Sequence, residues 1–390
     1  MIDPGHELPP IRVEKLLWRG RGLARLDSGQ VVIVEPGVLP GELIQARIVK
    51  IAKDFLQAEA VDILEQSPLR GAHPCPHGRE CGGSPFGMVK PEQALELKRD
   101  IAKDSMLRAL GRIHGANLPE LGIMPSPKGW RYRWRGQIHV RNGHPHAMGR
   151  ASNNTVPLSD CHLLADPLAQ ALPALAATLP DGRFTVAASP DTGVARTEKD
   201  ADLLPFSLPD FDLTLMLPAG VFFQANWELN QHLVRTAVHN LAGFERVADL
   251  FSGAGNFALP LATTGAEVLA VEGAPAAVSL GEEQRKRHRL TSVRFQAADL
   301  TKPRSWAFIR DFQPQAAILD PPRTGAKGIA RLLLDMPDLR RLVWISCDVV
   351  NTVRDLKPML DGGWTVSTIQ LYDMFPGTWH MEVLFILDRA

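Results

Sequence analysis

Apolar residues in the carboxyl-terminal half of the chain recur in short runs, separated by segments of helical character. Runs of strand length fall at residues 246–251, 268–271, 316–319 and 342–345, and an amphipathic helix is expected at about 227–241. Strands that alternate with helices in this way predict an α/β domain built on an open sheet.

The first 65 residues follow a different pattern, in which short extended segments are separated by turns. Residues 31–34 follow an Asp-Ser-Gly turn, residues 42–51 roughly alternate polar and apolar side chains, and residues 55–63 are again extended. This spacing predicts a small β-barrel of a kind that often binds single-stranded nucleic acid. Basic residues gather around Trp18, where either a solvated charged face or an RNA contact explains them: Arg12, Lys15, Arg19, Arg21 and Arg25.

Residues 91 to about 110 have helical character, and an alternating pattern follows at residues 129–141. A strand there would place Trp130, Tyr132 and Trp134 on one face. The opposite face would expose three arginines in a row, an arrangement suited to phosphate contacts.

The composition is that of an ordinary globular protein. The chain has 390 residues, of which 45% are hydrophobic and 22% charged, so two or three domains with a substantial core are expected. Basic and acidic residues both number 43, so any nucleic-acid surface must be a local patch. No run of 18 apolar residues occurs and the first residues lack a signal-peptide pattern, so we expect a cytoplasmic protein without a membrane span.

The four cysteines do not make a disulfide framework in a chain of this length, and they favour a reducing compartment with a metal or catalytic role. Cys75 and Cys81 are six residues apart in a loop rich in proline and glycine, which is typical of metal ligands, and Cys161 is a candidate third ligand. Cys347 ends an apolar strand. It is either a buried cysteine that caps a core strand or a nucleophile at the carboxyl edge of the sheet.

A glycine-rich turn follows the strand at residues 246–251. Gly253, Gly255 and Ala258 satisfy the loose G-x-G-x-x-G/A pattern, and Glu272 ends the next strand. Such a turn lets a ligand approach the backbone, and the acid can accept hydrogen bonds from both ribose hydroxyls. The pattern indicates a nucleoside cofactor and leaves open whether it is NAD or S-adenosylmethionine.

Two more acids stand at strand ends. The strand at residues 316–319 runs into Asp320 and two prolines, which fix a rigid loop. The prolines could serve only to end the strand in a turn, but their position beside the cofactor turn favours a functional site. Glu382 enters the last apolar strand, where a carboxylate is costly unless it is paired or used.

These motifs together make residues 221–390 resemble the 5-methyluridine RNA methyltransferases. The matching pieces, in the family's order, are Phe223-Gln224-x-Asn226, Asp249-Leu-Phe-Ser-Gly-Ala-Gly-Asn256, Val271-Glu272-Gly273, Asp320-Pro-Pro-Arg323-x-Gly325, Ser346-Cys347 and Phe375-Pro-x-Thr-x-His-x-Glu382. Six motifs in the right order are far more specific than any one of them.

The resemblance implies a fold for the whole chain. It implies an OB-fold-like TRAM barrel at residues 1–65, a central α+β domain at 66–215 and an α/β Rossmann-like class I methyltransferase domain at 216–390. The helix at about 91–112 is expected to pack on the catalytic domain. The leading barrel favours the rRNA branch, with 23S rRNA as the expected target, because the tRNA enzymes of this family are taken to lack it.

The resemblance also implies a mechanism. A thiolate adds to C6 of uracil, C5 takes the methyl group of S-adenosylmethionine, and a base removes the C5 proton. Cys347 is then the nucleophile and Glu382 the base, while Asp320 orients the uracil and the methyl donor. The target uridine must leave its stack. Cofactor contacts are expected at Gln224, Phe251, Asn256, Glu272, Asp299 and Asp320, and the surroundings of Asp299 are the least distinctive.

The chain departs from the family in two places. Relatives of the rRNA type hold a [4Fe–4S] cluster with four cysteines, whereas this chain offers Cys75, Cys81 and Cys161, with Ser84 where the fourth is expected. Serine is a poor iron ligand, so the cluster is expected to be absent, labile or completed by oxygen or water. The second departure is that Asp348 and Val349 replace the usual Asn-Pro after the nucleophile.

Other functions are compatible with parts of the pattern. A tRNA uracil-C5 methyltransferase would share the six motifs, and an RNA-binding protein with an inactive methyltransferase domain would keep the fold. An amino-group methyltransferase also uses Asp-Pro-Pro but normally follows it with an aromatic residue, where this chain has Arg323. An NAD dehydrogenase is the remotest alternative. We expect a monomer whose partner is RNA.

Overall fold

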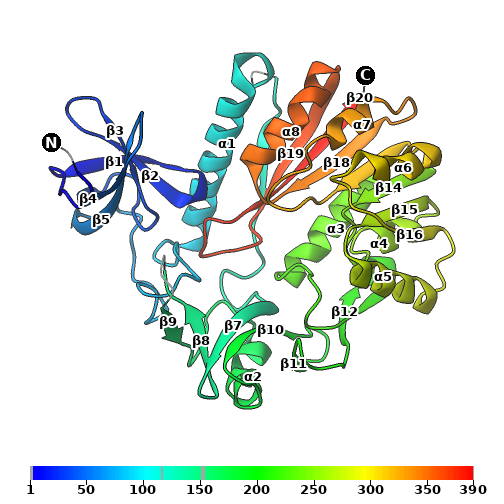
Figure 1. Ribbon diagram of the computed structural model, residues 1–390, viewed down its shortest axis with the longest axis horizontal. Helices are drawn as coiled ribbons and strands as arrows, with labels where there is room; N and C mark the ends of the chain where they lie inside the picture. Colours follow the sequence, from blue (N-terminus) through cyan, green and yellow to red (C-terminus); the bar gives the residue numbers. More distant parts are fainter. Residues whose placement is uncertain (1–2, 116, 151–153, 390) are drawn as a thin grey trace.

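The amino-terminal residues form a closed five-stranded barrel, at the blue end of the chain in Figure 1. The computed structural model describes residues 3–115, 117–150 and 154–389. Alternate residues of one strand, Ile44, Ala46 and Ile48, pack in the barrel core. The strands, in the order β1-β2-β3-β5-β4, are β1 (Ile11–Leu17), β2 (Arg21–Arg25), β3 (Val31–Val34), β4 (Leu43–Ile51) and β5 (Leu56–Glu65), and the 3-10 turn η1 (Trp18–Gly20) joins β1 to β2.

A long helix, α1 (Pro91–Gly115), stands between the barrel and the catalytic domain (Figure 1). It contacts β1 of the barrel and packs on α8 (Val349–Asp361). After it, β6 (Leu121–Met124) pairs in parallel with β19 (Trp364–Tyr372) and becomes an edge strand of the catalytic sheet. β6 lies within the segment expected to be a separate central domain, yet it is built into the catalytic sheet. The domain boundaries near residues 65 and 215 stay a prediction.

The central segment forms a second, smaller antiparallel sheet with a helix packed on it. Its strands, in the order β11-β10-β7-β8-β9, are β7 (Arg135–Arg141), β8 (His144–Met148), β9 (Thr155–Pro157), β10 (Gly182–Ala188) and β11 (Ala195–Thr197), and its helix is α2 (Asp166–Ala177). A two-stranded hairpin, β12 (Leu204–Leu208) and β13 (Leu213–Leu217), with η2 (Pro209–Phe211) at its turn, leads into the catalytic domain.

The strand expected over residues 129–141 is wrong in its first part, because only β7 is a strand. Arg131 has a φ of 58°, which turns the backbone away from the extended conformation, although Tyr132 and Trp134 are still buried alternately with the arginines. Its guanidinium donates to Asp160 at 2.6 Å, and Arg135 is half-buried with its guanidinium 5.7 Å from the ring of Phe222. The expected row of three solvent-exposed arginines therefore does not form.

The largest sheet has eight strands in the order β16-β15-β14-β17-β18-β20-β19-β6. The first five in this order are parallel, and β20 is antiparallel to both of its neighbours. The strands are β14 (Arg246–Leu250), β15 (Glu267–Glu272), β16 (Val293–Ala297), β17 (Ala316–Leu319), β18 (Arg341–Ser346), β19 and β20 (Glu382–Arg389). The chain builds outward from β14 to β16 and then returns past β14 to β17. Ligands of open α/β sheets bind beyond the carboxyl ends of the strands at such a reversal.

Alternate residues of these strands enter two apolar cores on the two faces of the sheet. Val247 and Ile318 belong to one core and Ala248 and Leu319 to the other. Because both faces are covered, β14, β15, β17 and β18 are largely apolar, which is the pattern that predicted them. The covering helices are α3 (Trp227–Leu241), α4 (Ala258–Thr263), α5 (Pro275–Arg287), α6 (Ala307–Phe312), α7 (Ile329–Leu334) and α8, with a 3-10 turn η3 (Pro303–Trp306). Within the described ranges, no helix is long and apolar enough to cross a bilayer.

Candidate active site

The glycine-rich turn after β14 is held by its own backbone. Phe251 has a φ of 67°, and the N–H groups of Phe251 and Ser252 both donate to the carbonyl of Val271, at 2.9 and 3.0 Å. Gly255 has a φ of 98°, and a Cβ atom there would lie 2.9 Å from Leu259. Glycine is therefore required at this position for both its conformation and its space. The turn presents backbone at the carboxyl edge of the sheet.

Glu272, at the end of β15, is fixed beside this turn. Its Oε2 accepts the N–H of Gly253 at 3.0 Å, and its Oε1 accepts the N–H of Ala274 at 2.8 Å. Each carboxylate oxygen keeps a further lone pair for a ligand. The turn and the acid thus have the geometry that binds the ribose of a nucleoside cofactor.

A cavity of about 740 Å³ opens at this edge of the sheet, and we call it the catalytic cavity. It collects seven of the residues expected at the site, namely Gln224, Phe251, Asn256, Glu272, Asp320, Cys347 and Glu382. Asp299 is not among its lining residues. That carboxylate, exposed in the turn after β16, accepts hydrogen bonds from Thr301 and pairs with Lys302 at 3.0 Å, which lowers its pKa to about 2.

Cys347 stands between β18 and α8, at the point where the strand ends. The next residue, Asp348, is the N-cap of α8 and accepts the N–H of Asn351 at 3.0 Å, which fixes the path of the chain beyond the thiol. Burial, followed by the carboxyl groups of Glu382 and Asp320, raises the pKa of the Cys347 thiol to about 12. The thiol is therefore protonated in the free protein at neutral pH.

Glu382 begins β20, which lies beside β18 in the sheet, and this pairing brings the acid to the thiol. Burial, followed by Asp320, raises the pKa of the Glu382 carboxyl well above its usual value, and Arg323 opposes the shift. Burial also raises the pKa of Asp320, to about 6, against a hydrogen bond from Gln224. Oε2 of Glu382 is buried and accepts no hydrogen bond from the described part of the protein.

The structure adds three residues to which the sequence reasoning gave no role. Phe222, Arg323 and His380 all line the catalytic cavity. Phe222 is 67% exposed, an unusual position for a phenylalanine. Burial, followed by the positive charge of Arg323, lowers the pKa of His380 to about 3, so this imidazole is neutral. All three lie in or beside the quoted motifs, which was the available signal.

The cysteine loop does not offer the donors of a four-thiolate cluster. Cys75, Cys81 and Cys161 are half-buried and lie within electrostatic reach of one another, since burial and then Cys161 and Cys75 raise the pKa of the Cys81 thiol. Across the described residues, however, no three His, Cys, Asp or Glu side chains have an arrangement that could hold a metal ion. Ser84, at the fourth position, has its hydroxyl 3.2 Å from Nε2 of His73. The side chain expected to complete the donor set is therefore bonded elsewhere.

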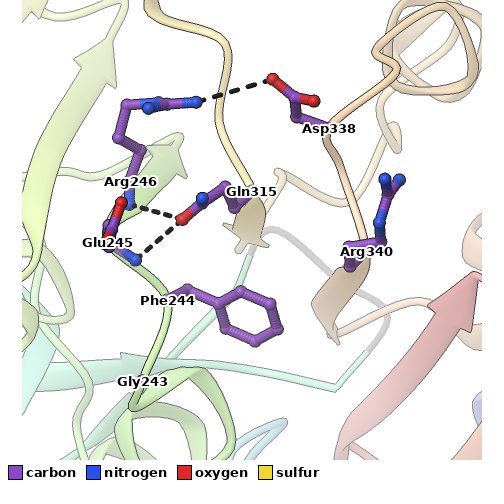
Figure 2. A pocket seen from close by; sticks show the side chains of 7 residues that line it. All are labelled: Gly243, Phe244, Glu245, Arg246, Gln315, Asp338 and Arg340. Atoms are coloured by element: carbon purple, nitrogen blue, oxygen red, sulfur yellow. Dashed lines mark hydrogen bonds and ion pairs between the residues drawn. The ribbon is translucent and has the colours of Figure 1, made fainter.

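A second pocket, of about 410 Å³, lies at the opposite edge of the sheet. Figure 2 shows its polar lining, in which Gln315 accepts the N–H groups of Glu245 and Arg246 and the Arg246 guanidinium pairs with Asp338 at 3.6 Å. These residues precede β14, β17 and β18, so they lie at the amino ends of the strands. The groups bond to one another, and none of the expected site residues is among them.

The fold and the catalytic cavity define a class I S-adenosylmethionine-dependent methyltransferase with an amino-terminal TRAM barrel. Family models match at residues 201–390, described as tRNA (Uracil-5-)-methyltransferase, and at residues 9–61, described as TRAM domain. The chain belongs to the RNA uracil-C5 methyltransferase family, as the resemblance predicted.

Relatives align over nearly the whole chain. The 23S rRNA (uracil(1939)-C(5))-methyltransferase RlmD of Chromohalobacter salexigens is 31% identical over 97% of this chain and 89% of its own. The RlmD of Dichelobacter nodosus is 32% identical over 99% of this chain and 100% of its own. Because the chain belongs to this family, it is not a member of the dehydrogenase or amino-group methyltransferase families considered above.

A solved structure shares the whole fold. The tRNA (uracil-54, C5)-methyltransferase of Pyrococcus abyssi, in complex with S-adenosyl-L-homocysteine, has a TM-score of 0.72 and 19% identity and covers 97% of this chain. Because that coverage includes the barrel, a leading barrel does not separate rRNA enzymes from tRNA enzymes. That step of the sequence argument was wrong.

Proposed function

We propose that this protein methylates C5 of a uridine in 23S rRNA. The proposal is supported by the names of relatives that align over nearly the full chain at 31% and 32% identity. Methylation of a tRNA uridine is the second candidate, and the whole-chain likeness to the Pyrococcus abyssi enzyme favours it. Both candidates use the same chemistry at the catalytic cavity.

In the proposed reaction Cys347 is the nucleophile. Its sulfur bonds to C6 of the uracil, the electron pair of the C5=C6 bond moves toward O4, and the thiol proton leaves to water at the mouth of the cavity. The thiol is protonated before the substrate arrives, because burial and two neighbouring carboxyl groups raise its pKa to about 12. Attack therefore follows placement of the ring, and the positive charge of Arg323 opposes those carboxyl groups.

Glu382 is the proposed base. After methyl transfer, C5 carries both the methyl group and its original proton, and the Glu382 carboxylate takes that proton. The electron pair left behind re-forms the C5=C6 bond, the C6–S bond breaks, and Cys347 leaves as a thiolate that regains a proton from water. A carboxylate with a raised pKa is a stronger base than an exposed one, and Oε2 of Glu382 has no competing donor among the described residues.

S-adenosylmethionine supplies the electrophilic methyl group when it is bound. The proposed contacts are the expected residues that line the catalytic cavity: Gln224, Phe251, Asn256, Glu272 and Asp320. Asp299 is left out because it does not line the cavity. Glu272 has the fixed orientation that a ribose diol requires, and Gln224 and Asp320 are 3.5 Å apart, so they act as one polar group.

We propose that the cysteine loop is organised by His73 rather than by an iron–sulfur cluster. Its Nδ1 lies 3.1 Å from both the N–H and the carbonyl of Cys75, and its Nε2 lies 3.0 Å from the carbonyl of Ser84. A Cβ atom at Gly78 or Gly87 would lie within 2.2 Å of the ring, so two glycines make its space. The imidazole occupies the middle of the loop and bonds both of its ends.

The protein is proposed to act in the cytoplasm as a monomer that binds RNA. Four free cysteines support a reducing compartment.

The test is methyl transfer from labelled S-adenosylmethionine to two transcripts, an unmodified 23S rRNA fragment and an unmodified tRNA. Label at uracil C5 in the rRNA alone supports the main proposal, and label in the tRNA alone supports the second candidate. Absence of label from both, with total RNA also negative, would show that the fold has lost catalysis. Cys347→Ala is expected to abolish transfer, and retained turnover would remove the covalent mechanism.

A further inference from the structure

The turn η1 of the barrel contacts the catalytic domain beside the catalytic cavity. A Cβ atom at Gly20 would lie 3.1 Å from side-chain atoms of both Trp379 and Phe86, so the backbone of the turn approaches both closely. The Trp379 ring centroid is 3.6 Å from that of His380, which lines the cavity. The turn thus reaches the cavity through two stacked side chains, Trp379 and then His380.

Arg19, in the middle of this turn, is held beside the nucleophile. Its φ of 67° and ψ of 23° are left-handed, a conformation that an arginine adopts only when its surroundings require it. Its Nη2 is 3.9 Å from Oδ2 of Asp348, the residue that follows Cys347. A cation from the RNA-binding type of module therefore lies next to the proposed nucleophile.

The guanidinium of Arg19 keeps its donors available. Its side chain is 60% exposed, and it donates no hydrogen bond to the described residues. The 3.9 Å separation from Asp348 is longer than the roughly 2.7–2.9 Å of a charge-assisted hydrogen bond. By contrast, Arg12 at the other end of β1 is engaged by Glu65 at 2.6 Å and by the Gly41 carbonyl at 2.7 Å.

Arg19 is one of three arginines, one from each part of the chain, whose charges act on His380, and Arg323 itself lines the cavity. After burial, the positive charges of Arg323, Lys98, Arg133 and Arg19 all lower the pKa of His380, which places them within electrostatic reach of that ring. Within the described residues, Arg133 and Arg323 have no ion pair with a carboxylate. The charged group of RNA is the phosphodiester, and its oxygens match the planar fork of a guanidinium.

We propose that Arg19 binds a phosphate of the RNA strand next to the target uridine, so that the barrel helps to position that nucleotide at Cys347. The inference rests on the proposed function for the identity of the target base, but not for the phosphate contact. The alternative is a structural role, in which the Arg19–Asp348 ion pair only holds the barrel on the catalytic domain.

The test compares full-length variants for RNA binding and turnover. Arg19→Gly removes the guanidinium and is expected to fold, because glycine adopts the left-handed conformation without strain. Arg19→Lys keeps the charge, and Arg12→Ala is the control because that guanidinium is already engaged. Asp348→Asn keeps an N-cap residue but removes the carboxylate that pairs with Arg19. The dissociation constant for the rRNA fragment is measured by fluorescence anisotropy over a range of salt, and KM and kcat are measured for methylation.

Arg19→Gly is expected to raise Kd and KM roughly tenfold, to change kcat by less than about threefold, and to reduce the slope of log Kd against log salt by about 0.7–0.9. Arg19→Lys recovers that slope, and Arg12→Ala matches the wild type. Asp348→Asn binds RNA at least as tightly as the wild type.

An unchanged Kd and salt slope in Arg19→Gly would overturn the assignment, as would Asp348→Asn weakening binding as much as Arg19→Gly. A wild type that binds the rRNA fragment without methylating it contradicts the proposed function, and the salt slopes of the variants still decide the role of Arg19.

Discussion

The buried ion pair between Lys98 and Asp373 ties α1 to the loop that carries His380. The Lys98 side chain has no exposure, and its Nζ donates to Oδ1 of Asp373 at 2.5 Å and to the carbonyl of Phe375 at 2.9 Å. Burial lowers the pKa of Lys98, and the Asp373 carboxylate opposes that shift. Lys98→Met fills a similar volume, but it leaves a carboxylate and a carbonyl buried without their donor.

The size of the effect follows from this geometry. Removing one partner of a buried ion pair costs about 3–5 kcal/mol, because the remaining charge stays desolvated and unpaired. If the catalytic domain unfolds as one unit, about 2–4 °C are lost per kcal/mol in a domain of this size, so the apparent Tm falls by roughly 6–20 °C. Methylation at a temperature below the transition also falls, because residues 375–380 lose an anchor.

Two further variants test the reasoning by differential scanning fluorimetry. In Lys98→Met with Asp373→Leu both charges are gone, and most of the lost Tm is expected to return, since an apolar pair of similar volume is often as stable as the ion pair. Lys103→Met changes an exposed lysine of the same helix and is expected to shift Tm by less than about 2 °C. The account fails if Lys98→Met melts with the wild type, or if the double variant is no more stable than the single one.

Three more predictions concern the site. The Glu382→Gln variant should still bind RNA and methylate uracil C5, but without the base it should accumulate a covalent protein–RNA adduct through Cys347 that survives denaturing electrophoresis. Release of product at the wild-type rate would exclude Glu382 as the base. Because Glu382 adds to the burial that raises the pKa of Cys347, the same variant should lower that pKa. Iodoacetamide labelling of the peptide with Cys347, read by mass spectrometry at pH 8, should then be faster, since more thiolate is present; slower labelling would reverse the sign of the coupling. Purified protein should contain well under one iron per chain, and His73→Ala should lower Tm while His77→Ala, in the same loop, should not; stoichiometric iron with sulfide, or equal melting of the two variants, would contradict the proposed role of His73.

The motifs of the catalytic half could be found from sequence because their spacing is local. The glycine turn needs positive φ angles at fixed offsets, and Cys347 and Glu382 each mark the end of an apolar strand. What spacing did not give is which strands are neighbours. β20 lies beside β18, and that pairing, over residues far apart in sequence, brings Glu382 to the thiol.

The sequence by itself determined the barrel, the α/β catalytic domain and the polar and reactive residues at its strand ends, because the periodicity of apolar residues and the turn residues are local patterns within short stretches of the chain. Only the tertiary structure decided the rest. It turned the backbone at Arg131 where the alternation predicted a strand, added β6 to the catalytic sheet, and brought Arg19 beside Asp348. These outcomes depend on which distant surfaces can pack together and which charges can be paired, and no pattern within one segment contains that information.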